Sequence, residues 1–325
     1  MVAARDPLAA DGRTRPSRRL RLADHAPILT LILLCGATAL LTDRFLSPLN
    51  LSNILVQCSV MAVIAMGMTF VVIGGGFDLS VGSVAALAGC VAAAVMVEAG
   101  IAAGVLAGLA ASALVGAANG LIVTRLKVNP FITTLGTMVL VRGVVFLLTG
   151  GAPVTGELGL PERFVQFGTE RLLGINDLVW VPACLLVGLG WVLHATPYGR
   201  RVFATGGGRE AAYLSGVPVD RITISTYVWC SLLAGVAGIM LASRLQSGQP
   251  TAGEFYELTA IAAVVLGGAA LHGGEGKLYN SVIGVFIMVV LGNGLNLLNV
   301  DSYWQRVAVG IVIISAAAAD RFRRS

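Results

Sequence analysis

The stretch Val71-Val-Ile-Gly-Gly-Gly-Phe-Asp-Leu-Ser-Val-Gly-Ser83 places glycines, an aspartate and serines inside a long apolar segment. A charged side chain within a membrane is costly, so Asp78 needs a structural or functional reason to be there. Glycines end helices, and Asp or Ser side chains cap the helices that follow. We therefore predict a helix break here, with Asp78 or Ser80 as the cap. A contact between Asp78 and a ligand is the alternative.

The composition around this stretch excludes an ordinary soluble domain. Hydrophobic residues make up 56% of the 325 residues and charged residues only 12%, against about a quarter in soluble proteins. All five cysteines and three histidines stand singly, without the spacing of a metal site. We expect a membrane protein that has no metal site and no catalytic residues.

Apolar runs of about 20 residues, the length that crosses a bilayer as a helix, fill the chain. They predict an all-α integral membrane protein with about ten spans, a basic arm (1–25), a transmembrane domain (26–320) and a short tail (321–325). The predicted spans are 26–43, 52–73, 79–98, 101–124, 130–149, 177–194, 222–243, 257–271, 279–298 and 303–319.

The basic residues set the predicted orientation. With the N-terminus inside and spans that alternate, sixteen of the 22 Lys and Arg residues fall on the inside and only four on the outside. The positive-inside rule expects this bias, so the net charge of +5 needs no nucleic-acid partner. We expect both termini to be cytoplasmic.

Two long loops connect the spans, an outside loop at about 151–176 and an inside loop at about 195–221. In the inside loop, three glycines at 206–208 free the backbone, residues 209–215 can make two helical turns, and Gly216 and Pro218 end them. This short helix is either an ordinary surface helix or a docking element for a separate soluble subunit.

Two nucleotide-site look-alikes lack essential parts. Gly206-x-Gly208-x-x-Ala211 follows no buried strand. The run that ends at Lys277 has Leu271 in place of the first glycine of a phosphate loop, and Leu278 in place of the Ser or Thr that holds Mg²⁺. We expect no ATP site in this chain.

Several motifs resemble those of ribose-type ABC transporter permeases, in family order over roughly residues 50–320. Gly75-Gly-Phe-Asp-Leu-Ser-Val-Gly-Ser83 is similar to the family signature, with Phe77 in place of the usual Ile. Gly208 and Arg209 depart from the family pattern. The other similar segments are Asn119 to Val123, Val128 to Thr137, Thr196 to Arg200, Gly206 to Gly216, Ala260 to Gly276, Asn293 to Asn296, and Trp304-Gln305.

The resemblance implies a type II ABC importer-like permease in a bacterial inner membrane. Such a subunit receives a monosaccharide or related polyol from a periplasmic binding protein and pairs with a second permease chain, identical or a close paralogue. ATP and Mg²⁺ are bound by a cytoplasmic ATPase partner. The implied ATPase-coupling loop comprises Gly206, Gly207, Gly208, Arg209, Glu210, Ala211, Ala212, Leu214, Ser215 and Gly216.

Polar residues inside the spans are candidates for a sugar pathway, although each is equally a candidate for a hydrogen bond between helices. For Arg142 we favour a contact with a carbonyl or an ion pair over substrate binding. The pathway candidates are Asp78, Ser80, Asn119, Thr133, Thr134, Asn293 and Asn296.

Three other functions remain open at this point. Permeases of the same fold carry nucleosides or branched-chain amino acids, but with different residues at the Gly-Phe-Asp-Leu-Ser position. An ion-coupled secondary transporter would need acidic residues inside the spans, and apart from Asp78 and Glu98 there are almost none. An intramembrane enzyme would need a catalytic constellation that the spans lack.

Overall fold

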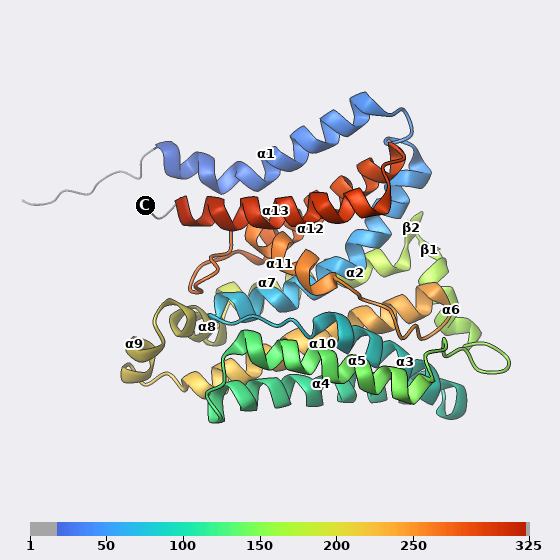
Figure 1. The fold of residues 1–325 in the computed structure, drawn as a ribbon, viewed down its shortest axis with the longest axis horizontal. Helices are drawn as coiled ribbons and strands as arrows, with labels where there is room; N and C mark the ends of the chain where they lie inside the picture. Colours follow the sequence, from blue (N-terminus) through green and yellow to red (C-terminus); the bar gives the residue numbers. More distant parts are fainter. Residues whose placement is uncertain (1–17, 323–325) are drawn as a thin grey trace, which may run out of the picture.

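The computed structural model describes residues 18–322, and these are almost entirely helical (Figure 1). Residues 1–17 of the predicted basic arm and residues 323–325 of the predicted tail therefore lie outside the described residues. The helices that belong to the bundle are α1 (Arg18–Leu41), α2 (Pro48–Ile73), α3 (Val81–Ala99), α4 (Ile101–Arg125), α5 (Pro130–Thr149), α7 (Trp180–Ala195), α10 (Val219–Leu245), α11 (Tyr256–Leu266), α12 (Leu278–Leu297) and α13 (Ser302–Phe322).

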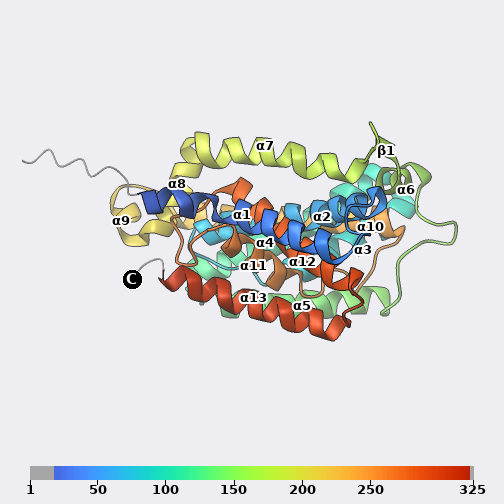
Figure 2. The same ribbon diagram turned by 90° about the horizontal axis from the view of Figure 1, so that it is seen from above.

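Seven of the described helical segments are long and apolar enough to cross a membrane, which makes this a multi-pass membrane protein. They are α2, α3, α4, α5, Asp177–Ala195, α10 and α12, while the apolar part of α1 and all of α11 are shorter. The helices run along one common axis (Figures 1 and 2). We call the two ends of the bundle the α9 end and the α6 end, after the short helices α9 (Arg209–Leu214) and α6 (Glu162–Thr169).

The bundle consists of two halves that run in opposite directions. In the first, α2 arrives at the α9 end, an extended break (74–80) follows, and α3, α4 and α5 complete the half. In the second, α10 leaves the α9 end and reaches the α6 end, a break (246–255) follows, and α11, α12 and α13 complete it. The first helix of each half packs on the other half: α10 packs on α3 and α4, and α2 packs on α11 and α12. The two first helices, α2 and α10, also pack on each other. Such inverted repeats are a common plan of membrane transporters.

The core lies around α2, whose most apolar stretch is 94% buried. Close approach of backbones holds the neighbouring helices together: a methyl group on Gly120 of α4 would lie 2.7 Å from Ile224 Cα of α10. By contrast, α4, α5 and α7 each bury less than a quarter of their apolar stretch. Large apolar side chains on them, such as Leu114, Leu147 and Val187, are exposed, as expected for helices that face lipid.

Three sequence predictions need correction. The eighth span was predicted over 257–271, but α11 ends at Leu266, because the Gly267-Gly268 pair breaks the helix. Gly206 and Gly207 were predicted to be free backbone, but they form the last turn of α8 (Pro197–Gly207). The outside loop was predicted only as turn-rich, yet it contains α6 and a small hairpin of β1 (Arg171–Leu172) and β2 (Ile175–Asn176).

Candidate functional site

The loop at the α9 end contains two consecutive helices, α8 and α9. The Thr196 hydroxyl accepts a hydrogen bond from the Gly199 amide and starts α8, and Pro197 fits its first turn. α9 ends at Gly216, whose left-handed backbone lets the Gly216 and Val217 amides bond to the Tyr213 and Ala212 carbonyls. The predicted helix stop is thus confirmed, although α9 has six residues rather than seven.

α9 presents an exposed surface beside a shallow cleft of about 570 Å³. Tyr213 and Leu214 are 71% and 79% exposed, whereas Ala212 is buried against the bundle. Arg209 bonds Asp220 Oδ1 at 2.8 Å and so ties α9 to the start of α10. The other residues that line the cleft are Arg125, Glu210, Tyr213, Pro218, Val219 and Arg221. Apolar and charged groups together suit a protein partner.

The last turn of α8 is locked against two other segments by backbone contacts. A methyl group on Gly206 would overlap the Ile73 carbonyl oxygen at the end of α2. A methyl group on Gly274 would lie 2.6 Å from Gly207 Cα, and the Gly274 amide donates to Ile73 O at 2.8 Å. We call this meeting of Ile73, Gly206 and Gly274 the glycine contact. No side chain separates these backbones, so the last turn of α8 and the end of α2 are in direct backbone contact.

The α8 helix is also fixed by a half-buried tyrosine, Tyr198. The Tyr198 hydroxyl lies 2.9 Å from Ser225 Oγ of α10. Burial raises the pKa of Tyr198, and the hydrogen bond to Ser225 lowers it by less. Tyr198 is therefore a neutral anchor between α8 and α10.

The first break is closed by its own side chains. Asp78 Oδ1 accepts from the Ser80 amide at 2.9 Å and from the Ser80 hydroxyl at 2.6 Å, just before α3 begins. Tyr227 of α10 donates to the Phe77 carbonyl at 3.2 Å. Asp78 thus closes the turn before α3, but it bonds the Ser80 amide rather than an amide inside the helix, and Ser80 makes no capping bond, so neither side chain caps α3 in the predicted way.

A buried hydrogen-bond chain continues from this break. Asn119 of α4 donates to the Ser80 hydroxyl at 3.0 Å and accepts from Thr137 of α5 at 2.7 Å. Asp78, Ser80 and Asn119 are each 0% exposed. The sequence missed Thr137, although it lies one helical turn after the predicted Thr133 on the same face.

The second break is held by side chains from distant parts of the sequence. Arg142 of α5 donates to the Pro250 carbonyl at 2.6 Å and to the Ala252 carbonyl at 2.9 Å. These bonds are the carbonyl contact that we favoured for Arg142 from the sequence. Arg306 of α13 lies over the Phe255 ring, with 5.1 Å from its guanidinium carbon to the ring centre. The second break also touches the first turn of α3, directly after the first break, because a methyl group on Gly82 would overlap the Gly253 carbonyl oxygen.

The remaining predicted pathway residues are not brought together with these. Asn293 forms a reciprocal amide pair with Asn50 of α2, at 2.7 and 3.1 Å, which favours a bond between helices. Thr134 bonds the Pro130 carbonyl of its own helix, and Thr133 Oγ1 is buried without a partner among the described residues. Asn296 is exposed near the α6 end of α12.

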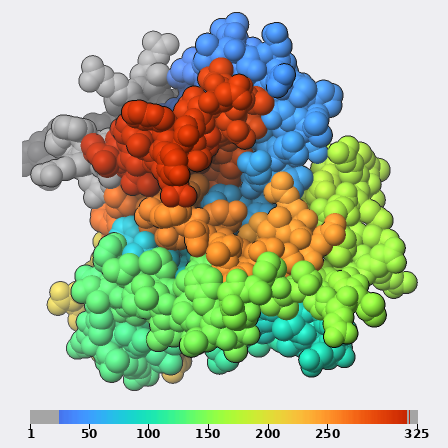
Figure 3. All heavy atoms as spheres, turned by 45° about the vertical axis from the view of Figure 1, so that its right-hand side comes forward, coloured from blue at the N-terminus to red at the C-terminus, as the bar shows by residue number. Residues whose placement is uncertain are grey.

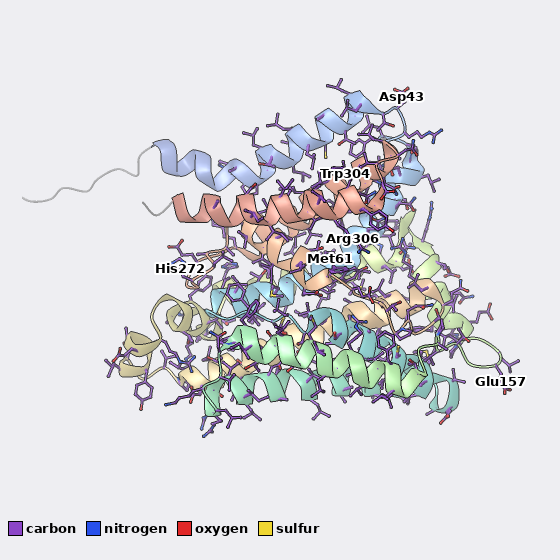
Figure 4. All side chains as sticks on the ribbon, viewed as in Figure 1. Asp43, Met61, Glu157, His272, Trp304 and Arg306 are labelled. Atoms are coloured by element: carbon purple, nitrogen blue, oxygen red, sulfur yellow. The ribbon has the colours of Figure 1, made fainter. Side chains whose placement is uncertain are left out.

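The rest of the described surface offers no alternative centre. Within residues 18–322, no group of His, Cys, Asp or Glu is arranged to hold a metal ion. Figure 4 shows His272 in the loop before α12 near the α9 end, while Glu157 lies in the loop at the opposite end. The backbone of His272 lies beside the first break, since a methyl group on Gly75 would lie 3.7 Å from the His272 carbonyl oxygen.

Comparison with known proteins gives a consistent result. The family model described as "Branched-chain amino acid transport system / permease component" matches residues 50–317. The ribose import permease protein RbsC of Bacillus subtilis is 46% identical over 301 residues, 91% of this chain and 92% of the relative. Its Escherichia coli K12 counterpart is 44% identical, over 92% and 94% of the two chains.

A third relative has a different sugar in its name. The L-arabinose transport system permease protein AraH of Escherichia coli K12 is 38% identical over 289 residues, 89% of this chain and 87% of the relative. No solved structure matches the chain significantly.

Proposed function

The chain belongs to this permease family and is the membrane-spanning subunit of a monosaccharide ABC importer, for which we propose a pentose as the cargo. It is a transport subunit, not an enzyme, and works with an ATPase and a binding protein. The observation that carries the pentose proposal is the similarity over about nine-tenths of the chain to permeases named for ribose and L-arabinose.

We assign the α9 end to the cytoplasm and the α6 end to the periplasm of a bacterial inner membrane. Arg125, Arg200, Arg201 and Arg221 lie at or near the α9 end, in agreement with the positive-inside rule. In this assignment the chain has ten spans, counting α1, α11 and α13, and both termini are cytoplasmic. The basic arm (1–25) and the tail (321–325) then flank one transmembrane domain (26–320).

α9 and the glycines beside it form the docking element for the ATPase in this proposal, with ATP and Mg²⁺ held by that partner and no cofactor in this chain. The exposed Tyr213 and Leu214 supply apolar contact area, and Arg209 and Glu210 supply charges beside the cleft. ATP-driven closure of the partner would push α9 and, through the glycine contact, α2. The other residues of the coupling loop determine the backbone path from α8 to α9. They are Gly206 to Gly208, Ala211, Ala212, Ser215 and Gly216.

A second permease chain, identical or paralogous, completes the pathway in our proposal. Helices α5 and α13 lie on the side of the bundle opposite α7 (Figure 2), and residues of the second break and α11 are visible between them in Figure 3. α13 presents exposed Trp304, and Arg306, two residues further along, lines a cleft between α11, α12 and α13 (Figure 4). Two copies facing each other here would enclose the second break.

In this proposal, some of the polar residues support the structure and others line the pathway. Asp78, Ser80 and Asn119 are fully buried, and they hold the first break in place without facing the pathway. Thr133 and Thr134, near the α9 end of α5, and Asn296 remain candidates for contact with the sugar. Asn293 is engaged by Asn50 and serves the contact between α2 and α12.

The function is tested by reconstituting the chain with the ATPase and binding protein of its genomic neighbourhood in proteoliposomes. ATP-dependent uptake of labelled ribose or L-arabinose, well above uptake of galactose or myo-inositol, is the expected result. Uptake of a nucleoside or a branched-chain amino acid instead would overturn the sugar assignment. Uptake by this chain alone, driven by an ion gradient without ATP, would overturn the ABC assignment.

The docking assignment is tested separately with Ala211→Trp, an exposed position on α9. The bulky side chain should reduce transport-coupled ATP hydrolysis at least tenfold. The control is Ala204→Trp, at an exposed position on α8. Equal activity of the two variants would contradict docking through α9.

A further inference from the structure

A narrow apolar groove lies at the α6 end of the bundle, away from both breaks. α4 contributes Ile101, Val105 and Leu109 to one wall, and α10 contributes Val236, Ile239 and Met240 to the other. Val181 of α7 and two phenylalanines of α6 complete the lining, and the groove holds about 330 Å³. It lies between helices that face the membrane, so its natural surroundings are lipid.

The length of the groove matches one leaflet of the bilayer. Ile101 and Leu109 are eight residues apart on α4, which corresponds to about 12 Å along the helix. Half of a typical hydrocarbon core is about 15 Å thick. Because α4 begins at the α6 end, the groove starts at the membrane surface and covers most of that leaflet.

The width of the groove selects a single alkyl chain. A volume of about 330 Å³ spread over that length leaves a channel roughly 6 Å across, whereas a helix with side chains needs about 10 Å. A partner helix therefore does not enter it. A sugar does not fit its chemistry, because Arg163 is the one residue of the lining with a polar side chain.

Arg163 stands at the surface end of this groove. It lies on α6, and α6 is fixed to the end of α10, since the Ser243 hydroxyl donates to the Phe164 carbonyl. Within residues 18–322, the Arg163 guanidinium forms no hydrogen bond or ion pair. An arginine without a partner above an apolar channel offers the planar donor group that binds phosphate oxygens.

We propose that this groove binds one phospholipid, with an acyl chain between α4 and α10 and the headgroup phosphate on Arg163. The lipid fills the space between α4, α10, α7 and α6 and so fixes α6 against the bundle. The proposal needs only that the chain spans a membrane. It does not depend on the sugar that is transported.

The test compares lipid retention by the purified full-length chain in mild detergent, measured by native mass spectrometry. The wild-type chain should retain one dioleoyl phosphatidylglycerol after washing, and Arg163→Gln should reduce the retained fraction at least fivefold. Arg171→Gln is the matched control, because Arg171 belongs to the same loop but lies outside the groove. Equal retention by the two variants would overturn the phosphate contact.

A second pair of measurements tests the acyl chain and the phosphate independently. Val105→Trp fills the groove and should abolish retention of the lipid, while Leu106→Trp, on the exposed face of the same helix, should not. Dioleoylglycerol, which has the same chains without phosphate, should be retained at least fivefold less than the phospholipid. Retention by Val105→Trp at the wild-type level, or of dioleoylglycerol as well as the phospholipid, would overturn the proposal.

Discussion

The two breaks occupy equivalent places in the two inverted halves, yet they are held in different ways. In the first, Gly75 has a left-handed backbone, and Asp78 closes the turn two residues before α3 through Ser80. In the second, Gln246 and Phe255 have the left-handed backbone, which is unfavourable for residues with a side chain. Its carbonyls are satisfied by Arg142, more than a hundred residues away in the sequence.

This difference assigns the breaks different mechanical roles. The first break is closed by the bonds between Asp78 and Ser80 and is joined to α8 at the glycine contact, so we expect it to follow the α9 end. The second break is held by Arg142 and by the paired backbone bonds between Val154 and Gly248, so we expect it to follow α5 and the loop after it. We infer that a push at α9 and a rearrangement of α5 reach the centre through separate breaks, and that the second break meets the start of α3 at Gly82 and Gly253.

The largest effect is expected where the second break meets the first turn of α3. Gly82→Ala would place a methyl group on the Gly253 carbonyl oxygen, which is a backbone atom that cannot move aside like the end of a flexible side chain. Overpacking of this kind costs about 3 kcal/mol, so we expect a strongly lowered melting temperature in detergent. Gly136→Ala is the control, because a methyl group there meets no atom within 4 Å. Equal stability of the two variants would mean that the second break does not touch α3.

The next effect is expected at the glycine contact, on the side of the first break. Gly206→Ala would force α8 away from the Ile73 carbonyl, at a cost of about 2 kcal/mol. In the reconstituted importer it should lower sugar uptake more than basal ATP hydrolysis, because the lever from α9 to α2 is loosened. The neighbouring Gly207→Ala adds a methyl group that meets no atom closer than 3.9 Å, and it should behave as wild type.

The first break could be predicted from the sequence because its cause is local. The glycines, Asp78 and Ser80 that form it stand within seven residues, and the apolar runs on both sides fix the helices. The same holds for the Gly216 stop of α9. The Asn119 link to Ser80 could not be predicted, because it depends on how α4 packs against α3.

The sequence predicted the position of the second break, as the gap between the spans 222–243 and 257–271, but not the contacts that hold it, because their cause is distant. Residues 246–255 contain neither a glycine run nor an aspartate at the start of α11, and the contact with Arg142 forms only after α5 has folded against them. The sequence did indicate that Arg142 needs a polar partner. It could not say that the partner is a bend in the other half of the chain.

Arg142 allows a direct test of the second break. Arg142→Gln removes both guanidinium bonds to the Pro250 and Ala252 carbonyls, and hydrogen bonds inside membranes are worth about 0.6 kcal/mol each on average. We expect a loss of about 1 to 2 kcal/mol, seen as a lower melting temperature and as faster hydrogen exchange across 246–255. Exchange across 74–80 should not change. Faster exchange in both breaks would contradict their separate attachment.

The smallest effect is expected for Asp78→Asn in the first break. The asparagine oxygen can accept the same two bonds from Ser80, and its amide group would replace Oδ2, for which no hydrogen bond is found among the described residues. We expect a change below about 1 kcal/mol and nearly normal transport. Asp78→Leu removes the acceptor and leaves the Ser80 amide and hydroxyl unsatisfied in a fully buried place, at about 1–3 kcal/mol for each group. If Asp78→Asn folds normally but transports no sugar, the carboxyl group has a role in transport beyond closing the turn before α3, and the first break is no longer only structural.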